Sequence, residues 1–259
     1  MTLSEKSYKI KEMDSLTEDT IYSSDIKIYQ NKEGYRFNSD SMILSWFIYQ
    51  ILGTKKNFNS LEIGSGTGII PIVLNKRGYL SKIECVELQS TLFELLKLNI
   101  STNKLEGSLF PHKKDFREFA KSNASKFDLI FTNPPYFKQN EGKISKNNEK
   151  AAAKHEISGS LFDFLSVSQN ILAYKGHFIF IYPLSKIYYA LGAAQQNNFG
   201  LKRLFLFREK PDCAPNFFCA DLIYKGDVPN SEINMVTIRN NEGNYTKLGL
   251  EIMYESPNL

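Results

Sequence analysis

The sequence predicts an α/β protein whose mostly parallel sheet is covered by helices on both faces. From residue 59 onward, short apolar segments alternate with longer segments in which apolar residues recur at helical spacing. The short segments are apolar throughout, as expected for strands that are buried on both faces. Sheets of this kind bind ligands at the carboxyl ends of their strands, so we expect the functional residues there.

Composition narrows the class of protein. The chain has 259 residues, of which 42% are apolar and 23% are charged, as is typical of a globular protein. No stretch reaches the roughly 18 apolar residues of a membrane span, and the N-terminus lacks the apolar core of a signal peptide. The three cysteines lack metal-ligand spacing. We expect a cytoplasmic protein with no membrane partner and no metal, and the composition carries no signal for an oligomeric state.

The N-terminal part is predicted to pack on a larger main domain. Alternation over 25–37 suggests a hairpin that turns at Asn31 to Gly34. Residues 41–52 are apolar almost all round, as in a buried helix. We therefore expect residues 1–52 to form a hairpin and a helix on a main domain of residues 53–259, with both parts making one domain overall.

The main domain is predicted to alternate strands and helices. Strands are expected at 59–63, 82–88, 108–115, 127–133, 176–184, 201–207 and 217–225. Helices are expected at 68–78, 90–104, 161–173 and 185–198. The polar run 139–156 is predicted to be a loop.

A glycine loop follows the first of these strands. Gly64, Gly66 and Gly68 alternate with Ser65 and Thr67, which lets the backbone turn sharply and approach a ligand closely. The sixth position of the dinucleotide fingerprint is not glycine, which disfavours a pyrophosphate ligand. A cofactor without phosphates fits this loop better, although glycine loops after strands are also common turns.

Three acids stand in or after the first three strands. Glu87 ends the second strand, where a carboxylate can accept hydrogen bonds from both hydroxyls of a ribose. Asp115 ends the third strand and can accept from an exocyclic amine or belong to a surface turn. Glu62 lies inside the first, apolar strand, and an unpaired buried charge is costly. We expect Glu62 to find a donor near the glycine loop, for example a cofactor amine.

The fourth strand ends in Asn133-Pro134-Pro135-Tyr136. The Asn133 side-chain oxygen and the Pro134 carbonyl can together accept both protons of a planar amino group. The prolines fix φ and remove two backbone donors, so the segment is rigid and offers acceptors. Tyr136 offers a ring on which a base can stack, worth about 1 to 3 kcal/mol. Accepting both protons makes the nitrogen lone pair available, and a sulfonium methyl group is the electrophile that fits.

These motifs together resemble a known family. The segments LEIGSGTG, VEL and FTNPPY, in this order and spacing, resemble class I S-adenosylmethionine-dependent methyltransferases that act on amino groups. With YQNKEGYRFNSDSMILSWF before the glycine loop and AAAKHE after the polar loop, the chain from Tyr29 onward is similar to the tRNA1(Val) (adenine-37-N6)-methyltransferase family. The resemblance implies a Rossmann-like sheet of seven strands, S-adenosyl-L-methionine as cofactor and tRNA as partner.

The resemblance also implies roles for individual residues. Cofactor contacts are implied at Glu62, Gly64, Gly66, Glu87 and Asp115, and target contacts at Asn133, Pro134, Pro135 and Tyr136. Arg36, Phe37 and Asp40 are implied to border the cofactor pocket from the N-terminal side. Lys154 departs from the pattern, because relatives often have arginine there and a lysine lacks its planar fork.

Other substrates fit the same motif. Glutamine N5-methylation of a protein such as a release factor uses an amide in the same way, and amino-methylation of rRNA or DNA is a further alternative. A catalytically inert RNA-binding protein is the alternative outside enzymes. Basic clusters at 113–126, 138–154 and 202–210 fit either a solvated face or a grip on RNA phosphates.

Overall fold

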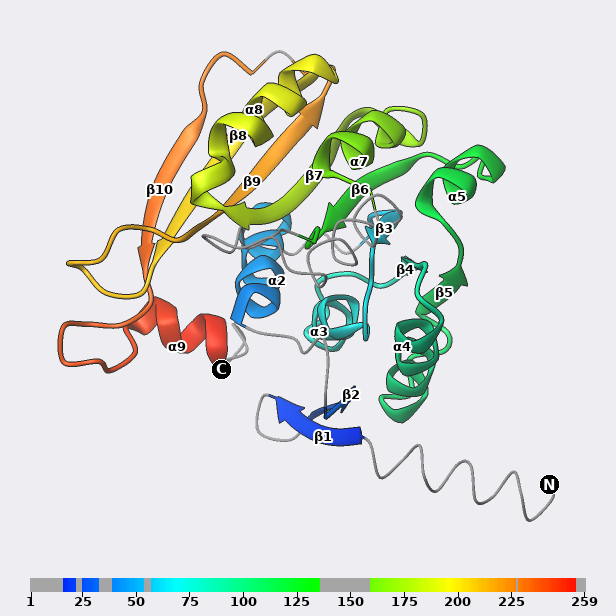
Figure 1. Cartoon of the computed structure of the whole chain (residues 1–259), viewed down its shortest axis with the longest axis horizontal. Coiled ribbons are helices and arrows are strands. Elements are labelled where there is room, and N and C mark those ends of the chain that lie inside the picture. Colours follow the sequence, from blue (N-terminus) through cyan, green and yellow to red (C-terminus); the bar gives the residue numbers. More distant parts are fainter. Residues whose placement is uncertain are drawn as a thin grey trace, which may run out of the picture.

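An eight-stranded sheet forms the centre of the protein in the computed structural model (Figure 1), with the strand order β10-β8-β9-β7-β6-β3-β4-β5. The structure describes residues 16–21, 25–32, 39–53, 57–135, 159–226 and 228–254. The strands of this sheet are β3 (Ser60–Ile63), β4 (Ile83–Glu87), β5 (Leu109–Lys113), β6 (Phe127–Thr132), β7 (Leu172–Pro183), β8 (Phe199–Arg208), β9 (Phe217–Tyr224) and β10 (Glu232–Thr237). The predicted α/β class, with a mostly parallel sheet, is confirmed, because β9 alone runs against its neighbours among these strands.

The predicted number of seven strands is wrong by one. The additional strand, β10, pairs in parallel with β8 at the edge of the sheet. Its sequence, EINMVT, has a single buried residue, Val236, so it lacks the continuous apolar run from which the other strands were predicted.

Helices cover both faces of the sheet (Figure 1). One face carries α2 (Ser39–Leu52), α3 (Ile69–Lys76), α4 (Ser90–Thr102) and α9 (Lys247–Met253), and the other carries α5 (Phe116–Ser122), α7 (Leu161–Ser168) and α8 (Ile187–Gln196), which follows the short helix η1 (Leu184–Lys186). The helix predicted over 161–173 ends early, at Ser168, and β7 already begins at Leu172.

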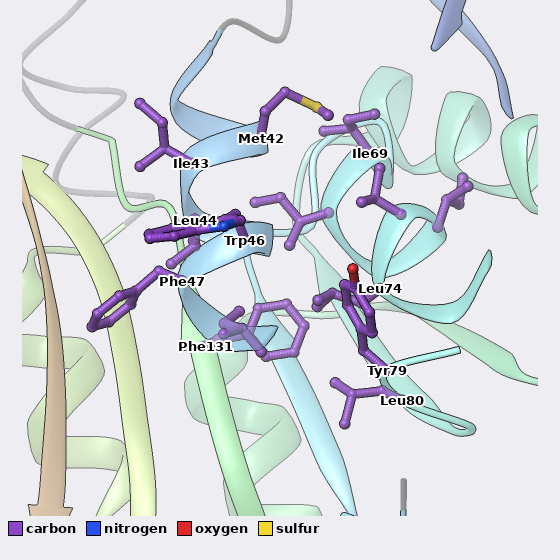
Figure 2. Close-up of a cluster of buried hydrophobic side chains, with 14 of the residues drawn as sticks. Met42, Ile43, Leu44, Trp46, Phe47, Ile69, Leu74, Tyr79, Leu80 and Phe131 are labelled. Atoms are coloured by element: carbon purple, nitrogen blue, oxygen red, sulfur yellow. The ribbon is translucent and has the colours of Figure 1, made fainter. Parts of the chain in front are cut away.

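The prediction of a buried helix over 41–52 is confirmed by α2. Its side chains pack in several directions (Figure 2), with Phe47 directed toward the strands and Met42 toward Ile69 of α3. The rings of Phe47 and Phe205 of β8 have centroids 5.0 Å apart. A helix enclosed in this way needs no continuous polar face, which explains why apolar residues lie almost all round it.

An N-terminal hairpin is present, and it includes a strand that was not predicted. β1 (Leu16–Ile21) and β2 (Ile26–Asn31) pair antiparallel, and Asn31 lies opposite Leu16. The strand at 26–31 therefore pairs with the segment before it, whereas residues 33–38, which include most of the predicted turn and the strand after it, lie outside the described residues. Ile26 and Ile28 of β2 are buried in the core that α2 and α3 also form. The predicted loop at 139–156 lies outside the described residues.

The order of the strands creates a switch point. From β3 the chain builds β4 and β5 on one side, and it then returns to place β6 on the other side of β3. All four strands are parallel, so their carboxyl ends form one edge of the sheet. In open α/β sheets the ligand site lies at such a reversal of strand order, here between β3 and β6.

Candidate active site

The strand ends bring together most of the residues predicted to act. Gly64 and Gly66 follow β3, Glu87 ends β4, Asp115 follows β5, and Asn133 to Pro135 follow β6. Because these four strands are parallel neighbours, the predicted residues lie along one edge of the sheet. Tyr136, Arg36 and Phe37 lie outside the described residues.

The glycine loop has a backbone that requires glycine. Gly64, Gly66 and Gly68 have φ of +72°, +55° and +85°, in the left-handed region that other residues rarely adopt. A Cβ on Gly68 would lie 2.5 Å from Leu96 Cδ1 of α4, whereas a Cβ on Gly64 would meet no atom within 4 Å. Gly68 therefore serves packing, and the space beside Gly64 leaves room for a ligand against the main chain.

Glu87 fastens the glycine loop to β4. Its Oε2 accepts a hydrogen bond of 2.8 Å from the Gly66 amide, and its Oε1 accepts one of 2.7 Å from the Gln89 amide. Burial raises the pKa of this carboxyl above its usual value, and the backbone amides of Gln89, Gly66 and Leu88 act against that rise. Each carboxylate oxygen can accept a second hydrogen bond, so this arrangement leaves capacity for ligand hydroxyls.

Glu62 is buried and incompletely paired. The residue is 1% exposed, and its Oε2 has no hydrogen-bond partner among the described residues. Burial raises the pKa of this carboxyl well above its usual value, and the charge of Glu87 adds to the effect. The Ser65 hydroxyl in the adjacent loop lies close enough to the Glu62 carboxyl to act against the rise of its pKa, whereas the Thr67 hydroxyl lacks a partner within the described part of the chain. The unsatisfied oxygens of Glu62 and Thr67 beside one glycine loop fit a polar ligand that supplies their partners.

Asp115 caps helix α5. Its Oδ1 accepts hydrogen bonds from the Arg117 amide and from Arg117 Nε, at 2.8 and 2.9 Å. The guanidinium carbon of Arg117 lies 5.0 Å from the centroid of the Phe116 ring. The cap holds Asp115 at the end of β5, so the turn expected as an alternative to a ligand contact is present. A cap through one oxygen is compatible with a ligand contact through the other.

A residue that the sequence analysis missed places the Asn-Pro-Pro segment. The buried hydroxyl of Thr132 donates a 2.8 Å hydrogen bond to the carbonyl of Ile63, the residue before Gly64. This bond holds the ends of β6 and β3 together, so Asn133, the residue after Thr132, lies beside the start of the glycine loop. Asn133 is half-buried, Pro134 is buried and Pro135 is exposed. A threonine among apolar residues at a strand end is the signal that marks it.

Asp40 lies on a different side of the site. It is the second residue of α2 and is 2% exposed. Burial raises the pKa of the Cys219 thiol on β9, and the nearby Asp40 carboxylate raises it further. Asp40 is thus near β9 and β7, on the far side of the Asn-Pro-Pro segment from Glu87.

Within the described ranges, no group of three or more His, Cys, Asp or Glu is placed to hold a metal ion, and no helix is long and apolar enough to cross a membrane.

Comparison with protein families gives one match that covers more than half of the chain. Residues 43–181 match the family described as methyltransferase small domain. A protein of Flavobacteriaceae bacterium (strain 3519-10), named tRNA1(Val) (adenine(37)-N6)-methyltransferase, is 26% identical over 181 residues, which are 70% of this chain and 71% of that protein. A protein of the same name from Histophilus somni (strain 2336) is 30% identical over 61% of this chain and 65% of its own length.

Solved structures share the fold at low sequence identity. A predicted O-methyltransferase, protein Atu636 from Agrobacterium tumefaciens, has a TM-score of 0.62 at 12% identity and covers 85% of this chain and 100% of its own. The 16S rRNA N2 G1207 methyltransferase of T. thermophilus, solved with AdoMet and guanosine, has a TM-score of 0.59 at 15% identity, over 81% of this chain and 50% of that one. At such identities the likeness concerns the fold.

Proposed function

Because the chain belongs to the methyltransferase small domain family, we propose that it transfers a methyl group from S-adenosyl-L-methionine to N6 of an adenine in tRNA, at position 37 of the tRNA1(Val) type. The observation that carries the proposal is the hydrogen bond from Thr132 to Ile63, because it joins the end of the Asn-Pro-Pro strand to the start of the glycine loop. The names of the similar proteins in Flavobacteriaceae and Histophilus supply the substrate.

The cofactor fits the buried polar atoms and the open space at the glycine loop. When bound, S-adenosyl-L-methionine supplies an electrophilic sulfonium methyl group. We propose that the hydroxyls of the cofactor donate hydrogen bonds to the carboxylate oxygens of Glu87 and that the cofactor lies against the main chain at Gly64 and Gly66. A cationic or amino group of the cofactor would donate to the unpaired oxygen of Glu62. We assign Asp115 to the base end, and Arg36, Phe37 and Asp40 to the border of the pocket.

The target amino group belongs to the Asn-Pro-Pro-Tyr segment in this proposal. Asn133 Oδ1 and the Pro134 carbonyl accept its two protons, which orients the nitrogen and frees its lone pair. Prolines at 134 and 135 offer no amide that would compete as a donor. Tyr136 supplies the stacking face for the adenine. The roles are ones of orientation, and no strong general base is required of the chain.

Exposed aromatic side chains on the same edge favour a nucleic acid as substrate. Phe162 and Tyr189 lie in the first turns of α7 and α8, and the Phe162 amide donates to the Tyr189 hydroxyl at 3.4 Å. Tyr188 beside them is 90% exposed. These helices start at the edge of the sheet where β6 and β7 end. Aromatic rings exposed beside the site suit bases that flank a target nucleotide.

The proposed substrate also implies a compartment, and the shared core implies how the domain is built. A tRNA substrate places the protein in the cytoplasm, where the three free cysteines remain reduced. We propose that residues 1–52 and 53–259 make a single domain, because α2 and β2 share one buried core with α3 and α4.

Methylation of defined RNA by the purified protein tests the proposed function. We expect mass spectrometry to detect N6-methyladenosine at position 37 after incubation of unmodified tRNA with the protein and S-adenosyl-L-methionine. Asn133→Ala is expected to lower the rate by about a hundredfold or more, on the scale of one lost hydrogen bond to a reacting group, with unchanged cofactor affinity. Asn123→Ala in the loop after α5 is the control. Methylated glutamine in a protein substrate, with no product in tRNA, would contradict the proposal.

A further inference from the structure

Asn99 joins three segments that are distant in the sequence. It lies on α4 and is fully buried. Its Oδ1 accepts a 2.7 Å hydrogen bond from the Tyr29 amide of β2, and its Nδ2 donates to the Tyr29 carbonyl at 3.0 Å. The same Nδ2 donates to the carbonyl of Thr67 in the glycine loop at 2.8 Å. Both amide protons and the oxygen of one side chain are thus used on backbone groups.

Asn103, one helical turn later, makes the same bonds to β2 without reaching the glycine loop. Its Oδ1 accepts from the Lys27 amide at 3.2 Å, and its Nδ2 donates to the Lys27 carbonyl at 2.7 Å. Its second donor contact is with the carbonyl of Asn99 in its own helix, at 2.8 Å. Four residues of helix rise about 6 Å, and two residues of strand rise about 6.8 Å. The two asparagines therefore match alternate residues of β2, and α4 lies against this strand of the hairpin.

The glycine loop is held from two directions. Glu87 holds it at Gly66 from the side of β4, and α4 holds it through Asn99 at Thr67. Leu96, on the same face of α4, fills the space beside Gly68 so closely that a Cβ there would collide with it. The position of Thr67 in the loop thus depends on where α4 and the hairpin sit.

We propose that Asn99 is a positioning residue that holds the glycine loop in the form that binds S-adenosyl-L-methionine, and that it couples this loop to the N-terminal hairpin. The proposal rests on the proposed function for the identity of the cofactor. β2 precedes the segment 43–181 that matches the family, so a part of the chain outside that match helps to form the cofactor site. Loss of the Asn99 amide leaves the buried Thr67 carbonyl without this donor, and the loop gains alternative conformations.

A matched pair of variants separates this role from general stability. Asn99→Ala and Asn103→Ala each remove one pair of hydrogen bonds to β2, so both are expected to lower the midpoint of unfolding. Asn99→Ala alone removes the bond to Thr67. By titration calorimetry we expect about tenfold weaker binding of S-adenosyl-L-methionine to Asn99→Ala, and binding within about twofold of wild type for Asn103→Ala.

Hydrogen exchange provides a second measurement without the cofactor. The Gly68 amide donates to the Ser65 carbonyl at 2.8 Å inside the loop, so its exchange rate reports how often this hydrogen bond opens. We expect faster exchange in Asn99→Ala than in Asn103→Ala or wild type. If the alanine variant does not fold, Asn99→Ser replaces it, because a serine adds no charge to the buried site and is too short to bond Tyr29 and Thr67 together.

The outcomes are distinct. Equal cofactor affinity and equal Gly68 exchange in the two variants overturn the positioning role and leave the proposed function intact. A wild-type protein that binds no S-adenosyl-L-methionine overturns the proposed function, whereas the exchange comparison still decides whether Asn99 holds the loop.

Discussion

Two buried carboxylates lie in the same row of the sheet and have opposite surroundings. Glu62 of β3 is in register with Phe131, which is in register with Ile179 and, through it, with Asp221 of β9. Asp221 is fully buried, and its two oxygens lie 2.7 Å from His177 Nδ1 and 3.0 Å from Arg203 Nη1. Glu62 is equally buried, but one of its oxygens has no partner in the described chain.

The comparison shows that burial alone does not tell whether a carboxylate has a structural role or a role in ligand binding. A buried carboxylate costs free energy unless donors or opposite charges meet it. At Asp221 the neighbouring strands β7 and β8 provide those groups, and Arg203 also reaches Glu232 of β10 at 3.1 Å. This network therefore stabilises the outer strands. At Glu62 the compensation is incomplete among the described residues, in keeping with our proposal that a ligand completes it.

The largest effect is expected from removing a partner of Asp221. Arg203→Met removes one of the two partners of the buried Asp221 carboxylate and leaves His177. We expect the free energy of unfolding to fall by about 3 to 5 kcal/mol. Lys202→Met removes a charge from the same strand and serves as control. Denaturant unfolding measures both variants. A loss below about 1 kcal/mol for Arg203→Met would show that the two acids do not differ in this way.

A crossed pair of substitutions tests the comparison directly. Glu62→Gln removes a buried charge, so the unfolding free energy is expected to be unchanged or higher, while affinity for S-adenosyl-L-methionine falls about tenfold, near 1.4 kcal/mol. Asp221→Asn is expected to lower stability and to leave cofactor affinity per folded molecule unchanged. Calorimetry and denaturant unfolding of both variants check the result. If the two substitutions have the same pair of effects, the assignment of Glu62 to the cofactor is wrong.

Two exposed tyrosines at opposite ends of β7 allow a similar comparison between a position near the candidate site and one away from it. Tyr188 lies at the edge of the sheet where β7 ends, and Tyr174 lies near the start of the same strand and is 69% exposed. We expect Tyr188→Ala to weaken tRNA binding about fivefold to tenfold, on the scale of one lost base stack. Tyr174→Ala is expected to leave binding unchanged. Fluorescence anisotropy with labelled tRNA measures both, and equal affinities of the two variants would remove the aromatic edge from the RNA surface.

The last expected effect is a pH dependence of the stability of the protein without cofactor. Burial raises the pKa of Glu62 above the ordinary value of 4.5, so the folded protein holds this proton more tightly than the unfolded chain does. The stability from this group is complete below pH 4.5 and is lost as the pH rises through the higher, folded-state pKa. Unfolding free energies measured from pH 4.5 upward are therefore expected to fall more in wild type than in Glu62→Gln. If the unfolding free energy depends on pH in the same way in both proteins, the pKa of Glu62 is not raised by folding.

The place of the candidate site in the fold could be predicted because its signals are local. The glycines, Glu87 and the Asn-Pro-Pro segment each follow an apolar strand, and a parallel sheet aligns such strand ends automatically. The partners of these residues could not be predicted. Thr132 bonds to a residue 69 positions away, and Asn99 bonds to one 70 positions away, and neither has a sequence pattern that names its partner.

The hairpin shows the same limit in the fold. The segment 26–31 has a strand pattern, but its partner at 16–21, LTEDTI, is too polar to stand out, so the pairing of these two segments was not predicted. β10 was missed because an edge strand needs few apolar residues.

The sequence by itself determined the alternation of strands and helices and the residue types at the strand ends, because hydrophobic period and the backbone limits of glycine and proline act over a few residues. Only the tertiary structure decided which buried acid is paired. Asp221 meets His177 and Arg203, which are 44 and 18 residues away, through strand order and register. Glu62 occupies the same row, and one of its oxygens has no partner among the described residues because its neighbours in that row supply no donor or opposite charge.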